Sequence, residues 1–263
     1  EERLNLANLN LLAGKKAKSS VAFEPALNYI RTGMALLPGD GWNSCYELTL
    51  RLHLECLETL RLTGGMEEMG PLFEAVKKNC RAPLDAVGAY ESRIKGFMAQ
   101  DRLREALVTA REILNLLGVG IPVRARKGES RRVLKETMAA LAGKEIETLV
   151  ELPEMKDPFQ LAVMKILVSM ISVIYIGTPD LFSHLLCKQV QGAIRYGNAP
   201  GSVFLYAAFG ALLCRLGDDI QAGYRFGAVA LSLAEKRYTL EHKGQAIHAV
   251  SCYIKHWKAP LRE

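Results

Sequence analysis

The stretch "LTGGMEEMGPLFEAV" at residues 62–76 has the pattern of a tight turn between two helices. An apolar run ends at Gly64 and its glycine neighbour, and a new run starts directly after them. Apolar side chains then recur at helical spacing, at Leu72, Phe73 and Val76. If such a hairpin recurs along the chain, the sequence predicts a stack of helix pairs, an architecture suited to recognition.

The hairpin does recur, with the spacing of tetratricopeptide repeats. That pattern begins with a small residue in the first helix of a pair and a second small residue about twelve positions later, in the second helix. A large apolar residue and a third small residue then follow in the second helix. Small residues let paired helices approach closely. The pattern fits Gly14, Ala26, Ile30, Gly33 and Pro38. Three further sets keep the spacing, although Met69 is large where a small residue is usual. They are Leu57, Met69, Phe73 and Val76; Ile94, Ala106, Ala110, Ile113 and Gly118; and Gly210, Ala222, Phe226, Val229 and Ala234.

We therefore expect an all-α fold, a tetratricopeptide-like α-solenoid of about twelve antiparallel helices. Residues 1–118 should form an N-terminal half of three helix pairs, and residues 158–263 a C-terminal half. Between them, residues 119–157 read as an irregular basic connector with one amphipathic helix over 129–142. The whole is expected to be one continuous superhelix.

The apolar run at residues 159–177 is about as long as a bilayer span. However, Lys165, Ser169 and Ser172 would form one polar stripe on a helix. Asp157 is suited to the N-cap of this helix and Pro158 to its first turn. We interpret the run as a buried helix of a protein without a membrane span.

The composition limits the function classes. The chain has 263 residues, of which 49% are hydrophobic, enough for a sizeable core. Its net charge of +6 is spread along the sequence, which does not indicate a nucleic-acid partner. The six cysteines form no C-x-x-C pair and suggest buried free thiols of a cytoplasmic protein. Because the chain begins with Glu1-Glu2, we interpret it as a piece of a longer protein.

Motifs of catalysis are missing from the sequence. Neither Gly14-Lys15 nor Gly143-Lys144 belongs to a phosphate-binding loop, and no G-x-S-x-G or H-E-x-x-H occurs. No catalytic residue, cofactor or metal is predicted. His248, Cys252 and His256 have helical spacing that could offer ligands to a soft metal, but a half-buried helix face with cysteine as an apolar filler explains them better.

Other polar and aromatic groups have two readings. Arg124, Arg126, Lys127, Arg131 and Arg132 are either a partner-binding site for phosphate or acidic groups, or a solvated loop. Asp218-Asp219 could be a carboxylate pair, but the two residues lie in a turn between helices, where Asp favours capping. The aromatic residues Tyr206, Phe209 and Phe226 are interpreted as core rather than as a ligand-binding box.

The helix at about 240–257 carries a large apolar face, formed by Ile247, Val250, Tyr253, Ile254 and Trp257. A terminal helix of a solenoid needs a covering neighbour or a polar face. If this face is exposed, it would promote self-association. We therefore expect a homodimer through the C-terminal helix.

Four stretches, at residues 10–38, 198–210, 222–236 and 256–263, resemble a helical region of large bacterial multidomain signalling proteins. Those proteins combine a Ser/Thr protein kinase domain, a STAND-type ATPase, this tetratricopeptide-like region, a GAF domain and a sensor histidine kinase. The resemblance implies that the longer protein binds ATP and works in two-component signal transduction. No catalytic residue of those domains can be carried over, because their motifs are absent.

Two functions fit these observations. The first is a non-catalytic interaction module that couples upstream kinase and ATPase domains to a downstream histidine kinase, with neighbouring domains or other signalling proteins as partners. The alternative is a small-ligand sensor of a STAND-type regulator, which would need a pocket with a few convergent polar groups.

Overall fold

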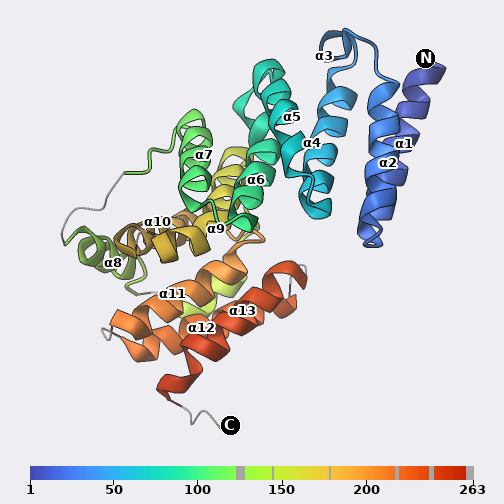
Figure 1. Ribbon diagram of the computed structural model, residues 1–263. Coiled ribbons are helices and arrows are strands. Elements are labelled where there is room, and N and C mark those ends of the chain that lie inside the picture. Colours follow the sequence, from blue (N-terminus) through green and yellow to red (C-terminus); the bar gives the residue numbers. More distant parts are fainter. Residues whose placement is uncertain (123–127, 144, 178, 217–218, 237–239, 259–263) are drawn as a thin grey trace. The chain divides into compact units, whose positions relative to one another are not determined.

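The all-α prediction is confirmed by a computed structural model of the chain. In the part that it describes, the chain forms thirteen α-helices, two 3₁₀ helices and a single isolated β-bridge (Figure 1). Two compact units are present, Glu1–Gly118 and Val119–Glu263. The single continuous superhelix stays a prediction. The described residues are 1–122, 128–143, 145–177, 179–216, 219–236 and 240–258.

The N-terminal unit consists of helix pairs in chain order (Figure 1). Within the pairs, α1 packs on α2, α4 on α5 and α6 on α7. Between the pairs, α2 packs on α4, and α4 packs on α6. The short α3 precedes α4. The bounds are α1 (Glu2–Ser19), α2 (Phe23–Ala35), α3 (Gly41–Ser44), α4 (Tyr46–Thr63), α5 (Met66–Asn79), α6 (Pro83–Ala99) and α7 (Leu103–Leu116).

The hairpin at residues 62–76 has the predicted form. Helix α4 ends at Thr63, Gly64 adopts a φ of 81°, and α5 begins at Met66. A positive φ at this position suits glycine, which has no Cβ to clash. The side chains that the repeat pattern singles out here are buried, namely Leu57, Met69, Phe73 and Val76.

Small residues mark the places where paired helices touch. A Cβ added to Gly14 would lie 2.7 Å from Ile30 Cγ1 and 3.2 Å from the carbonyl oxygen of Ala26. These are the partners that the repeat pattern predicts. A Cβ at Gly33 would lie 2.9 Å from Leu52 Cδ2 on α4, so this glycine allows the next pair to approach. The predicted anchor Ala106 is fully buried on α7.

We predict that Gly14→Ala lowers the free energy of unfolding by roughly 1–3 kcal/mol, because the added methyl group overpacks the α1–α2 crossing. Gly192→Ala is the matched control. A Cβ at Gly192, inside helix α10 (Pro179–Tyr196), would meet no atom of another part of the chain within 4 Å, so this change should stabilise by about 0.5–1 kcal/mol. Urea unfolding of the two variants measures the difference, and equal midpoints would show that the α1–α2 crossing is looser than described.

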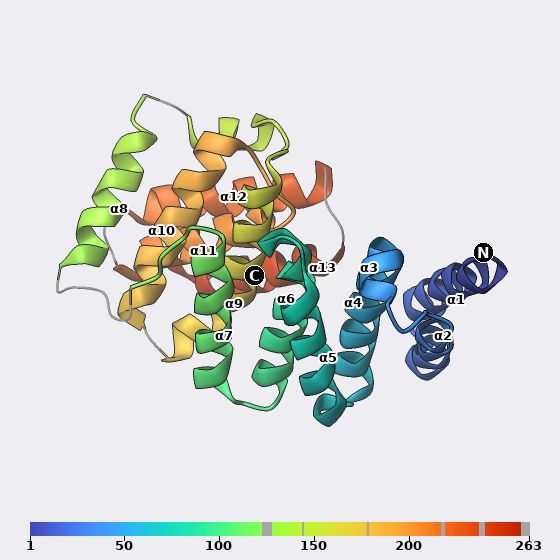
Figure 2. The same ribbon diagram turned by 90° about the horizontal axis from the view of Figure 1, so that it is seen from above.

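The C-terminal unit is less regular than the N-terminal one. Helix α10 packs on α8, α9 and α11, and α11 packs on α12 and α13 (Figure 2). The 3₁₀ helix η1 packs on α12. The bounds are α8 (Glu129–Ala140), η1 (Ile146–Glu151), α9 (Pro158–Gly177), α10 (Pro179–Tyr196), α11 (Ser202–Leu216), α12 (Ile220–Lys236), α13 (Leu240–Tyr253) and η2 (Lys255–Trp257).

Helix α9 is the predicted buried helix. Asp157 Oδ1 caps it by accepting hydrogen bonds from the backbone N–H groups of Phe159 and Gln160, at 2.8 and 3.1 Å. Ile166 and Met170 are fully buried, whereas Lys165 of the polar stripe is exposed. None of the helices in the described ranges has the length and apolar character that a membrane span requires.

Helices α11 and α12 approach each other closely at Gly210 and Gly223. A Cβ at Gly210 would lie 2.6 Å from the carbonyl oxygen of Gly223 and 3.2 Å from Phe226 Cβ. The repeat pattern predicted Ala222 at this contact, so the crossing is displaced by one residue. Ala222 is nevertheless buried. Phe226 is fully buried together with Tyr206 and Phe209, which confirms the core reading of these aromatic residues.

A buried asparagine joins the connector to the helical core. Asn198 Nδ2 donates to the carbonyl oxygen of Leu149 at 2.7 Å, and Asn198 Oδ1 accepts from Tyr206 Oη at 2.7 Å. Its backbone N–H donates to the carbonyl oxygen of Pro153, and its carbonyl accepts from Met155 N–H, both at 2.8 Å. Asn198 is fully buried, so these bonds are shielded from water.

Asn198→Ala should therefore destabilise the chain by roughly 2–4 kcal/mol, because it removes both side-chain hydrogen bonds of a buried amide and leaves a cavity in its place. Tyr206→Phe removes only one of these bonds and should cost about 1–2 kcal/mol. Thermal unfolding followed by circular dichroism tests the order. Equal losses for both variants would contradict the central role of the amide.

All six cysteines are free, as predicted, but they are not all buried. Cys56 and Cys187 are buried, and burial raises the pKa of each thiol to about 11. Cys214 is buried as well. For the other three the expectation of burial was wrong, since Cys45 and Cys80 are half-buried and Cys252 is exposed. Cys252 lies on an exposed stretch of α13, beside the exposed His248.

Candidate functional site

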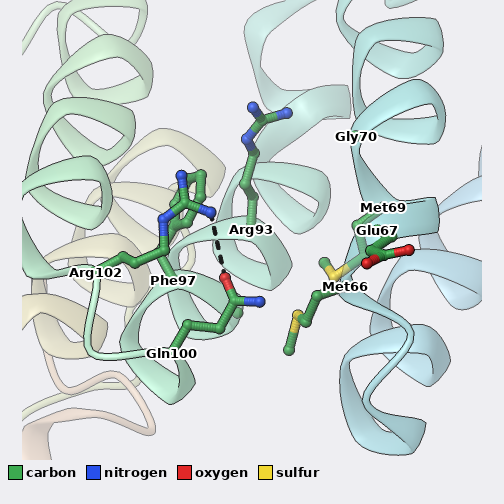
Figure 3. A pocket seen from close by; sticks show the side chains of 9 residues that line it. Met66, Glu67, Met69, Gly70, Arg93, Phe97, Gln100 and Arg102 are labelled. Atoms are coloured by element: carbon green, nitrogen blue, oxygen red, sulfur yellow. Dashed lines mark hydrogen bonds between the residues drawn. The ribbon is translucent and has the colours of Figure 1, made fainter.

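A pocket opens beside the hairpin that defines the repeat. It has a volume of about 250 Å³ and lies between α5, α6 and the turn that leads into α7 (Figure 3). Figure 3 shows Met66, Glu67 and Met69 of α5 facing Phe97, Gln100 and Arg102 across it. The lining residues are Met66, Glu67, Met69, Gly70, Arg93, Gly96, Phe97, Gln100 and Arg102.

The repeat spacing explains why α5 and α6 meet at this point. Met69 is a repeat anchor and is buried, although small residues are usual at its position. Gly96 on α6 makes room for this large side chain. A Cβ at Gly96 would lie 3.1 Å from Met66 Sδ and 3.6 Å from Met69 Sδ. The two flexible thioethers can adjust their shape to a bound group.

Two arginines hold the aromatic wall of the pocket. The Arg102 guanidinium carbon lies 4.6 Å from the centre of the Phe97 ring, and that of Arg93 lies 5.4 Å from the same ring. Arg93 also lies over the Phe73 ring, at 4.2 Å. These cation–π contacts fix both guanidinium groups without neutralising their charge.

The two arginines differ in their polar contacts. Arg102 Nε donates to Glu105 Oε1 at 2.9 Å, and its Nη1 donates to Gln100 Oε1 at 3.4 Å (Figure 3). Arg93 Nη1 lies 3.6 Å from Glu74 Oε1, which is an ion pair. Within the described residues this buried nitrogen has no hydrogen-bond acceptor. Arg93 therefore has unused hydrogen-bonding capacity.

The capacity of the pocket for an anion depends on Arg93. The lining carries two arginines and Glu67, while Glu105 and Glu74 from outside the lining pair with Arg102 and Arg93. Arg93 Nη1 still has no hydrogen-bond acceptor among the described residues. Guanidinium groups bind carboxylates through charge-assisted hydrogen bonds, and the methionines and Phe97 offer contact area for an apolar neighbour. The pocket can thus hold an acidic side chain next to an apolar one. It shows no arrangement of a nucleophile with a general base.

The arginine cluster predicted from the sequence is only partly described. Arg124, Arg126 and Lys127 lie outside the described residues. Arg131 and Arg132 are exposed in the first turn of α8. Arg132 pairs with Glu136 at 2.6 Å and with Glu129 at 3.9 Å on its own helix. A partner site at this cluster stays a prediction.

The other sequence candidates have structural or separate roles. Asp219 Oδ1 accepts a hydrogen bond from Ala222 N–H at 2.8 Å and so caps α12, as expected, whereas Asp218 lies outside the described residues. Cys252 Sγ lies 3.6 Å from His248 Nδ1. Among the described residues no group of three or more metal-ligating side chains forms, and Cys252 is exposed rather than a buried filler.

Sequence reasoning did not find the pocket beside the hairpin. Arg93 and Phe97 stand four positions apart on one helix, and Arg102 follows in the next turn. This spacing places an arginine against an aromatic ring, and it could have marked the pocket before the structure was known.

The chain is similar to one curated signalling protein. It is 24% identical over 286 aligned residues to hybrid signal transduction histidine kinase G of Dictyostelium discoideum. The alignment covers 97% of this chain but 8% of that kinase, so the chain spans a small part of its relative. No protein-family profile matches the chain, and no solved structure matches it.

We predict that a fluorescent peptide of alternating glutamate and leucine binds the 263-residue chain at this pocket. Arg93→Glu or Arg102→Glu should weaken binding by about tenfold or more, because each puts a repelling charge beside the acidic side chain. Arg104→Glu is the matched control, since Arg104 is exposed on α7 but does not line the pocket. Fluorescence anisotropy measures the affinities. Equal weakening by all three substitutions would mean that only net charge matters.

Proposed function

We propose that this chain is a non-catalytic interaction module of a multidomain signal-transduction kinase. The observation that carries the proposal is the similarity to a hybrid histidine kinase over 97% of the chain, within a segment that makes up 8% of that kinase. A segment of this kind fits a regulatory region between larger functional domains. The helix pairs of the N-terminal unit support the proposal, because stacked helices present broad surfaces for partners.

In this proposal the module couples upstream Ser/Thr kinase and STAND-type ATPase domains to a downstream histidine kinase in the cytoplasm. The resemblance to bacterial multidomain proteins supplies this domain order. The pocket beside the hairpin supplies a contact point, since its two arginines suit an acidic segment of a neighbouring domain or of another signalling protein. The coupling acts through binding, and the chain itself transfers no phosphate.

The test uses the longer protein that carries this chain. Histidine autophosphorylation from ATP is measured for the wild type, for a deletion of residues 1–263, and for Arg93→Glu with Arg104→Glu as the matched control. Deletion should change the phosphorylation rate or its response to the upstream domains, and Arg93→Glu should reproduce part of that change.

Two results would contradict the proposal. One is an unchanged phosphorylation rate after deletion. The other is stoichiometric ATP binding by the isolated chain in calorimetry, which would indicate an activity of its own.

A further inference from the structure

The C-terminal unit contains a second cavity, of about 510 Å³, with an almost wholly apolar lining. Helix α11 forms its floor, since α11 packs on α10 on one side and on α13 on the other. Residues of α9 and α10 form one wall, and residues of α13 and η2 form the other. The apolar lining residues are Ile171, Tyr175, Phe182, Phe204, Ala208, Ala211, Leu212, Ala249, Tyr253 and Trp257.

The space exists because the floor carries small side chains between large ones. Ala208 and Ala211 lie on one face of α11, and Ala249 lies opposite on α13. Tyr175 and Phe182 pack edge to face, with ring centres 5.2 Å apart, and so brace the wall made by α9 and α10. The volume is within the range of small-molecule sites, which are typically about 300–1,000 Å³.

Three basic side chains line the cavity, and no carboxylate does. They are Arg215, His248 and His256. The Arg215 guanidinium carbon lies 5.8 Å from the centre of the Tyr175 ring. Among the described residues Arg215 forms no ion pair with a carboxylate.

Two contacts connect the end of α11 to η2. A Cβ at Gly223 of α12 would clash with Sγ of Cys214, the residue before Arg215. Tyr224, the residue after Gly223, donates through Oη to the carbonyl oxygen of Lys255, the residue before His256. Arg215 and His256, which both line the cavity, therefore stand on segments that these contacts bring together. The cavity therefore has an apolar body and one cationic end.

We propose that this cavity binds a small amphipathic carboxylate, with its apolar part over Ala208 and Ala211 and its carboxylate at Arg215 and His256. The charge complementarity and the small-residue floor select this class of ligand. The inference goes beyond the interaction role proposed above and does not rest on it. It provides the pocket that a small-ligand sensor requires.

The test compares two probes of equal chain length, dodecanoate and dodecan-1-ol, at micromolar concentration. The readout is the emission of Trp257, in a Trp42→Phe background that leaves Trp257 as the single tryptophan. Dodecanoate should bind saturably and about tenfold more tightly than the alcohol, because its carboxylate gains a charge-assisted hydrogen bond.

Two variants separate the parts of the site. Arg215→Ala should remove the preference for dodecanoate and leave binding of the alcohol unchanged. Ala211→Phe should fill the floor and abolish binding of both probes. Arg195→Ala is the matched control, because Arg195 is an exposed arginine of α10 that does not line the cavity. Circular dichroism melting checks that each variant folds. If Ala211→Phe does not fold, the comparison of Arg215→Ala with the wild type still tests the inference.

Three results would overturn the inference. Equal affinity for both probes would mean that the basic end recognises nothing, and unchanged binding in Ala211→Phe would mean adventitious binding elsewhere. The third is a dimer in light scattering that Trp257→Ala dissociates and dodecanoate does not affect. In that case a second copy of the chain covers this face, as the apolar helix at about 240–257 predicts.

Discussion

A side chain at Gly210 would collide with the backbone of Gly223, and the packing of the C-terminal unit depends on this close approach. It lets α11 and α12 pack almost backbone to backbone, which brings Phe209 and Phe226 into edge-to-face contact at 4.8 Å. Ile254 then reaches Gly210 and Gly227 from beyond α13. Gly14 plays the same part in the N-terminal unit, where it meets Ile30. In both units, therefore, a glycine without a Cβ lets two helices approach closely, and a large side chain packs against that glycine.

The sequence predicted those features that local spacing controls. The glycine and alanine anchors, the turn at residues 62–76 and the cap at Asp157 all depend on residues close together in the chain, and the structure contains each of them. The displaced contact at Gly223 shows the limit of this reasoning. Ala222 and Gly223 are both small, so spacing alone could not decide which of them the crossing would use.

Features that depend on distant residues were not predictable. Nothing near Asn198 in the sequence indicates that its amide binds the carbonyl of Leu149, 49 residues earlier. The cavity at Arg215 arises likewise from helices whose relative placement the repeat pattern leaves open, whereas the spacing of Arg93, Phe97 and Arg102 was a local signal of the other pocket. His248 and His256 were read as a half-buried face or as metal ligands, yet they border an apolar cavity. The residue type of these two histidines indicated a polar function, but which function they could serve depended on the helix that packs beside them.

The bonds that hold η1 have a consequence for how the chain folds. Arg225 on α12 binds Glu147, 78 residues away, and Lys236 binds Glu151 across 85 residues. Closing such long loops costs entropy before any contact repays it, and distant contacts slow folding. During synthesis the N-terminal helix pairs can form as they emerge, whereas η1 must wait for α12. The apolar residues Ile146, Leu149 and Val150 stay uncovered until then, so the C-terminal unit should be the later and more chaperone-dependent half, which pulsed hydrogen exchange during refolding would reveal.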